Sequence, residues 1–153
     1  MTKRQIIQRV REELLLQFER SKKASEMARE YATDGESRAR SKYDTQGLEA
    51  SYLAAGQADR AEDLAAMIAT FNAAPFPPFS ANDSIAEGAL VEVLLNGELC
   101  WFLFAPCAGG LTFETDGGEV TLLGPGAPLR KKLHGLKVGG RLKDPKLTVR
   151  ALA

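Results

Sequence analysis

Residues 2–32 of the chain read TKRQIIQRVREELLLQFERSKKASEMAREYA, and this stretch contains neither Gly nor Pro. Most of its residues are strong helix formers, so it predicts one long helix. Alternating three- and four-residue steps connect a heptad seam, which consists of Ile7, Val10, Leu14, Gln17, Ser21, Ala24, Ala28 and Tyr31. Because the large apolar side chains come first, a partner helix should be held most strongly near the N-terminus.

A second helical pattern covers residues 50–71. Its small and polar seam residues come first and its large apolar residues come last, which reverses the order of the first pattern. Its seam consists of Ala50, Leu53, Gln57, Arg60, Leu64, Met67 and Phe71. Between the two patterns stands Thr33-Asp34-Gly35, where Asp-Gly is a turn dipeptide and Asp34 can cap the next helix. Folding the chain back there aligns the two large apolar ends. Residues 1–73 are therefore expected to form an antiparallel coiled-coil hairpin with its tip near residues 33–37.

A proline-rich segment ends the second helix. Three of the four residues 75–78 are Pro, and Pro lacks the backbone N–H that a helix interior needs. Residues 74–82 are therefore expected to be a linker. Phe76 and Phe79 are expected to pack this linker onto the domain that follows.

After the linker, the hydrophobic periodicity changes from helical to strand-like. Residues 89–95 and 98–105 flank an Asn-Gly turn, and residues 111–115 and 119–123 flank a turn of sequence Asp-Gly-Gly. Both arrangements are typical of β-hairpins.

A short helix over residues 128–133 and a last strand over residues 146–152 complete the pattern. The expected fold class is α+β, a coiled-coil hairpin followed over residues 83–153 by a small antiparallel β domain with one helix. The apolar side chains expected in the core of that domain are Leu95, Leu99, Trp101, Phe102, Leu103 and Phe104.

The charges balance overall but not locally. Lys and Arg total 20 and Asp and Glu total 20, so the net charge is zero. This excludes a protein that binds nucleic acid through a large overall positive charge, and sequence-specific binding to nucleic acid is not expected. Residues 83–129 nevertheless contain seven acidic residues and no Lys or Arg, whereas residues 130–143 contain basic residues and no acid. The basic run is either a docking surface for an acidic partner or a solvent-exposed face.

Counting excludes several kinds of site. Cys100 and Cys107 have a spacing that fits neither a redox dithiol nor a zinc knuckle, so they are expected to be structural thiols. His134 is the only histidine, which excludes a multi-His zinc site. No apolar run reaches the roughly 20 residues that span a bilayer, and the N-terminus opens into a charged segment. A cytoplasmic location without membrane attachment is expected.

Two tracts carry a family resemblance. Residues 42–53, KYDTQGLEASYL, follow the expected tip, and residues 127–140, APLRKKLHGLKVGG, contain the short helix. Together with the hairpin, the proline linker and the sheet domain, they resemble the Gre-type transcription elongation factors, the GreA and GreB family, over the whole chain. The chain looks like a divergent, short member, because Ala127 and Gly140 stand where the family has a Ser and an Asp.

The resemblance implies an FKBP-like fold for the second domain and bacterial RNA polymerase as the partner. The globular domain would dock at the rim of the polymerase's secondary channel while the hairpin reaches toward the catalytic Mg²⁺. There it would modulate elongation or the cleavage of a backtracked transcript. Because the chemistry would belong to the polymerase, we expect a monomer with no active site and no intrinsic cofactor, which would share Mg²⁺ with the polymerase.

The resemblance also implies site residues. Counting back from Tyr43 places Glu36 at the family's first tip acid and Ala39 at the second. The candidate acids for positioning Mg²⁺ are Asp34, Glu36 and Asp44. The candidates for contacts inside the channel are Arg38, Arg40, Lys42 and Tyr43. The candidates for docking on the polymerase are Arg130, Lys131, Lys132 and Lys137.

Two other classes of function fit the same pattern. An FKBP-like domain could be a peptidyl-prolyl isomerase, and a coiled-coil hairpin could be an adaptor or pair with a second copy. Within the leading class, the sequence leaves open whether the protein stimulates or inhibits transcript cleavage.

Overall fold

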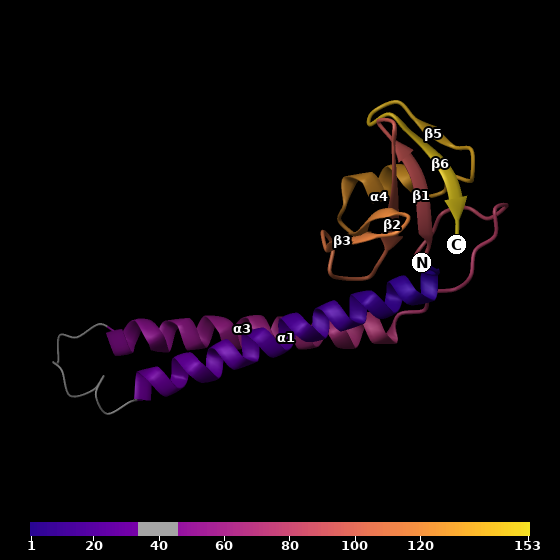
Figure 1. Cartoon of the computed structure of the whole chain (residues 1–153). Helices are drawn as coiled ribbons and strands as arrows, with labels where there is room; N and C mark the ends of the chain where they lie inside the picture. The colour runs from indigo at the N-terminus through magenta and orange to yellow at the C-terminus, as the bar shows by residue number, and fades with distance from the viewer. Residues whose placement is uncertain (34–45) are drawn as a thin grey trace. The chain divides into compact units, whose positions relative to one another are not determined.

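The computed structural model of the chain describes residues 1–33 and 46–153. Two long helices are followed by a six-stranded, mostly antiparallel sheet and a short helix (Figure 1). This confirms the expected fold class of a helical hairpin followed by a small β domain with one helix. The chain divides into two compact units, one formed by Met1–Gln8 with Thr70–Ala153 and the other by Arg9–Ala69.

The helices α1 (Lys3–Thr33) and α3 (Gln46–Ala73) form the hairpin. Within the unit Arg9–Ala69 they lie side by side and antiparallel (Figure 1). Two hydrogen bonds cross between them. The Ser25 hydroxyl donates to the Ala54 carbonyl at 3.1 Å, and the Arg60 guanidinium donates to the Gln17 side chain at 3.5 Å. In the described parts of the chain, neither helix contains a stretch apolar enough to cross a membrane.

The buried seam of this unit changes in size along its length. Its fully or nearly fully buried members are Val10, Leu14, Ser25, Ala28, Ala50, Ala54, Ala61 and Leu64. The expected gradient from large to small side chains is therefore present. The expected seam positions Tyr31 and Leu53 are wrong, because these side chains are 45% and 57% exposed. Ser25 can occupy a buried seam position because its hydroxyl donates a hydrogen bond to the Ala54 carbonyl on α3.

The sheet consists of six strands in the order β3-β4-β2-β1-β6-β5. The strands are β1 (Leu90–Leu95), β2 (Glu98–Phe104), β3 (Thr112–Thr115), β4 (Gly118–Leu123), β5 (Arg141–Leu142) and β6 (Leu147–Leu152). Both predicted hairpins are present. In the first, Asn96 and Gly97 both have positive φ, at 51° and 88°, which is the conformation that matches the twist of the two strands.

The expectation of a purely antiparallel sheet is wrong at one place. Strands β2 and β4 pair in parallel, with Trp101 opposite Val120. The β3–β4 hairpin inserts β4 next to β2 and leaves β3 at the edge. The tight turn makes β4 run opposite to β3. Because β3 runs opposite to β2, β4 runs in the same direction as β2.

One core of the sheet domain lies between the sheet and α4 (Pro128–Leu133). Phe102, Phe104 and Leu133 are buried in this cluster. Leu99 is 50% exposed, so its expected place in the core is wrong. The Leu99 carbonyl oxygen lies close to Gly118 of the neighbouring strand β4.

The linker packs onto the sheet domain through Phe79, as expected, whereas the expectation is wrong for Phe76, which packs against Phe71 of α3. Phe79 contacts the core cluster, and the Phe76 ring lies 5.0 Å from the Phe71 ring. Lys3 also holds the linker, because its ammonium donates to the Pro77 carbonyl at 2.6 Å and to the Ala153 carbonyl at 3.0 Å. Burial lowers the pKa of Lys3 to about 8.

Candidate functional site

The expected tip site falls in the segment between the two long helices. The candidate acids Asp34, Glu36 and Asp44 lie outside the described residues. The channel-contact candidates Arg38, Arg40, Lys42 and Tyr43 also lie outside them. Their use therefore stays a prediction from the sequence.

The helix ends that lead to this segment are described, and they carry exposed apolar side chains. Met27 is 60% exposed, Leu48 is 54% exposed and Tyr52 is 70% exposed. Meanwhile Ala28 and Ala50 are buried in the seam at this end of the hairpin. The expected seams did not include these residues, and the sequence analysis did not identify this exposed set. The signal in the sequence was an excess of apolar residues over what one narrow seam can bury.

The candidate docking residue Arg130 is used inside the sheet domain. Its guanidinium donates to the Ala105 carbonyl at 2.7 Å and to the Leu123 carbonyl at 2.9 Å. It forms an ion pair with Glu87 and lies 5.2 Å from the centre of the Phe104 ring. Burial lowers the pKa of Arg130. These contacts occupy its donors and join α4 to the ends of β2 and β4.

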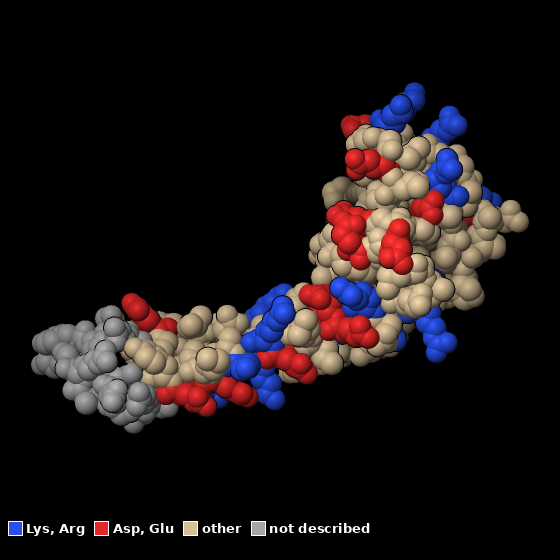
Figure 2. All heavy atoms as spheres, viewed as in Figure 1, with Lys and Arg blue, Asp and Glu red and all other residues tan. Residues whose placement is uncertain are grey.

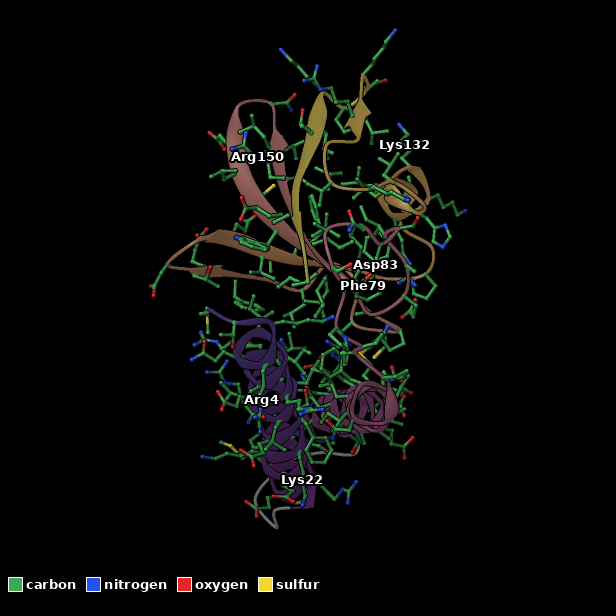
Figure 3. The ribbon with its side chains drawn as sticks, turned by 90° about the vertical axis from the view of Figure 1, so that its right-hand side faces the viewer. Arg4, Lys22, Phe79, Asp83, Lys132 and Arg150 are labelled. Atoms are coloured by element: carbon green, nitrogen blue, oxygen red, sulfur yellow. The ribbon has the colours of Figure 1, made fainter. Side chains whose placement is uncertain are left out.

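The other docking candidates are exposed to solvent. Lys131 and Lys137 project from the domain surface, and the Lys132 ammonium donates to the Asp144 carbonyl at 2.8 Å. Figure 3 shows Lys132 on α4. These three lysines are exposed, whereas the Arg130 side chain is only 13% exposed.

Asp83 lies near Lys137, and the pKa of its carboxyl group is lowered. The largest cause is a hydrogen bond from the Ser80 backbone N–H, at 2.7 Å, and the positive charge of Lys137 adds a smaller effect. The carboxylate caps the turn that ends the linker. It therefore stabilises the linker, and Lys137 forms no ion pair with any residue in 1–33 or 46–153.

Acidic residues gather on another part of the same domain, over β2 and β3 (Figure 2). Glu98, Glu114 and Glu119 line a hollow of about 440 Å³ together with Leu99 and Cys100. Glu114 and Glu119 are directly opposite each other on neighbouring strands, where like charges repel.

Cys100 and Cys107 are both partly buried, and neither forms a disulfide. Burial raises the pKa of Cys100, and the charges of Glu119 and Glu98 raise it further. Burial also raises the pKa of Cys107, and a backbone hydrogen bond with Phe71 partly opposes this. A raised pKa disfavours the reactive thiolate. Among residues 1–33 and 46–153, no three His, Cys, Asp or Glu side chains come together in a group that could hold a metal ion.

Comparison with known proteins gives a match among solved structures. No known family matches the chain by its family model, and no curated protein matches it. The chain is similar to the solved structure of the GreA factor homolog 1 protein of Thermus thermophilus, with 21% sequence identity, 94% of each chain covered and a TM-score of 0.35. An identity and a TM-score this low establish no shared site or function.

Proposed function

We propose that the protein binds the secondary channel of bacterial RNA polymerase and acts there as a transcription factor of the Gre type. In this proposal the hairpin enters the channel and its tip approaches the catalytic Mg²⁺. The factor has no active site of its own, because the polymerase carries out the chemistry. The proposal rests first on the sequence resemblance of residues 42–53 and 127–140 to that family.

The observation that supports it most is the graded seam of the hairpin. Alanines occupy the contact positions toward the end of the hairpin, at Ala28, Ala50 and Ala54, whereas Val10, Leu14 and Leu64 occupy the other end. Small contact residues allow two helices to approach to the short end of the 8–10 Å range. A helix pair with small contact residues toward this end suits insertion into a pore.

The charges of the segment at the tip fit the same role. Residues 34–44 include Asp34, Glu36 and Asp44 among several cations. Mg²⁺ prefers carboxylate oxygens, and a second metal can stabilise the attacking and leaving oxygens of a phosphoryl displacement. The missing second family acid, replaced by Ala39, weakens catalytic stimulation more than it weakens binding.

A transcript-cleavage assay tests this proposal. A purified, backtracked elongation complex is incubated with the protein, and the rates of RNA cleavage and of renewed extension are measured. We expect the protein to change at least one of these rates. If the tip acids position Mg²⁺, the double variant Asp34→Ala, Glu36→Ala abolishes the stimulation of cleavage and leaves polymerase binding intact.

The same assay separates stimulator from inhibitor. A protein that lowers both rates, with or without its tip acids, acts as an occluding plug. Rates equal to those of the complex alone, at protein concentrations well above that of the polymerase, would contradict the proposal.

A further inference from the structure

A basic surface at one end of the sheet domain extends beyond the docking candidates. We define it as the exposed residues Lys131, Lys132, Lys137, Arg141, Lys143 and Lys146. We propose that this basic surface binds the phosphate backbone of duplex nucleic acid without regard to sequence. This activity goes beyond the proposed function and does not require the polymerase.

Contacts place Lys132 beside the cations of the β5–β6 hairpin; Lys131 precedes Lys132 on α4, and Lys137 lies on the segment that leads to β5. Arg141, Lys143 and Lys146 belong to the hairpin of β5 and β6. The hydrogen bond from Lys132 to the Asp144 carbonyl places α4 beside the turn of that hairpin. Backbone hydrogen bonds between Val149 and residues 139–140 attach the segment after Lys137 to β6.

The figures agree with this placement. In Figure 2, blue side chains project from the end of the domain that carries β5 in Figure 1; some red side chains lie beside them, and others lie over β2 and β3. Arg150 points to the side of β6 away from α4 (Figure 3), so it is not part of the basic surface.

Few charges oppose the basic surface, and Asp83 acts on Lys137 without forming an ion pair. Arg130 is paired with Glu87, whereas the six residues of the surface form no ion pair with any side chain in residues 1–33 or 46–153. Asp144 is the only acid in residues 130–150. A neutral chain thus presents a locally concentrated positive charge, which can act on a polyanion at short range.

The composition of the surface favours phosphate over an acidic protein. Five of its six residues are Lys, and Lys is depleted in protein–protein interfaces. Phosphate backbones are contacted by Lys and Arg as point charges, independently of sequence. Residues 130–150 contain no Phe, Trp or Tyr, so the surface has no aromatic platform for the stacked bases of a single strand. Duplex nucleic acid is therefore the ligand that fits.

Fluorescence anisotropy of a labelled 20-base-pair DNA duplex tests this inference with the full chain and no polymerase. We expect a Kd of about 10⁻⁶ to 10⁻⁴ M near physiological salt. With six cations engaged, affinity should fall by about 10³-fold between 50 and 200 mM salt. No binding at 50 mM salt, or binding that does not depend on salt, would overturn the inference.

Matched variants assign the binding to the surface. Arg141→Gln, Lys143→Gln, Lys146→Gln together remove three cations that the docking proposal does not use, and the slope of log affinity against log salt should shrink by about 3. The control Arg20→Gln, Lys22→Gln, Lys23→Gln removes three exposed cations from α1 and should leave binding nearly unchanged. Equal losses in the two triple variants would contradict the inference.

A competitor separates nucleic acid from acidic protein. Poly-glutamate at the same concentration of negative charge should displace the duplex poorly, because a flexible chain does not present the phosphate spacing of a duplex. Displacement as effective as that by unlabelled duplex would overturn the assignment and give the surface to an acidic protein partner.

Discussion

Arg130 stands in a run of basic residues, and the run alone does not indicate which member faces the interior. The surrounding pattern predicted the short helix over residues 128–133, but the acceptors of Arg130 are the carbonyls of Ala105, just after β2, and of Leu123, at the end of β4. Such contacts depend on tertiary structure. For the same reason the sequence did not identify Lys3 as a residue that holds the linker. The carbonyls that accept hydrogen bonds from Lys3 belong to Pro77 and Ala153, which lie far along the chain.

Replacing Arg130 should destabilise the sheet domain. Arg130→Met leaves the Ala105 carbonyl without its donor and the Glu87 carboxylate without its partner, so we expect a loss of about 2 kcal/mol in the free energy of unfolding. Lys131→Met is the matched control and should change it by less than about 0.5 kcal/mol. Urea denaturation measures both, and equal effects would show that Arg130 is not a structural residue.

Asp83 should make the stability of the linker depend on pH. Hydrogen bonding to Ser80 lowers the pKa of Asp83 in the folded protein. The stabilisation is therefore present above the unfolded value of about 3.9 and is lost as the pH falls through the folded pKa.

Urea midpoints measured between pH 6 and pH 2.5 test this, since wild type should lose more stability than Asp83→Asn over that range. Asp116→Asn, which removes an exposed carboxylate from the β3–β4 turn, is the control. Parallel pH profiles for wild type and Asp83→Asn would contradict the assignment.

The sheet shows which element-scale features a sequence can predict. The two hairpins were predicted because turn residues specify them locally. The parallel pairing of β2 and β4 joins strands that are not consecutive, and no local pattern encodes that choice. Strand β5 has only two residues, too few to show a periodicity.

The parallel pairing should depend on Gly118. This residue has a φ of +116°, and a Cβ there would lie 2.9 Å from the Leu99 carbonyl oxygen on β2. We expect Gly118→Ala to lower the free energy of unfolding by about 1–3 kcal/mol. Gly126→Ala, where a Cβ would meet nothing within 4 Å, is the control. Gly118→Ala as stable as Gly126→Ala in urea would show that the close approach does not matter.

The helical hairpin should depend on its seam. Leu64 is 1% exposed and Leu15 is 48% exposed, so the same Leu→Ala change has different consequences at the two positions. We expect a loss of about 2–5 kcal/mol for Leu64→Ala and less than about 1 kcal/mol for Leu15→Ala. Hydrogen exchange of the helix amides measures the effect where it occurs. Equal increases in amide exchange for Leu64→Ala and Leu15→Ala would contradict the assignment of Leu64 to the buried seam.

Across the whole molecule the net charge is zero, but acidic and basic residues are segregated along the sheet domain. The sequence predicted the acidic and basic halves of the sheet domain, because the charges are segregated along the chain. It could not predict that Arg130, one of the expected docking residues, is only 13% exposed and bonded within the domain, because this depends on how distant segments pack. The candidate tip residues remain predictions from the sequence.

The central claim is that this chain is a partner of RNA polymerase, and co-elution tests it most directly. The protein is mixed at micromolar concentration with purified bacterial core RNA polymerase at moderate salt and passed over a gel-filtration column. The account predicts that the protein moves to the elution volume of the polymerase, and that the triple variant of Arg141, Lys143 and Lys146 to Gln does so as well. Elution of the wild-type protein at its own volume, with none in the polymerase fractions, would contradict the account.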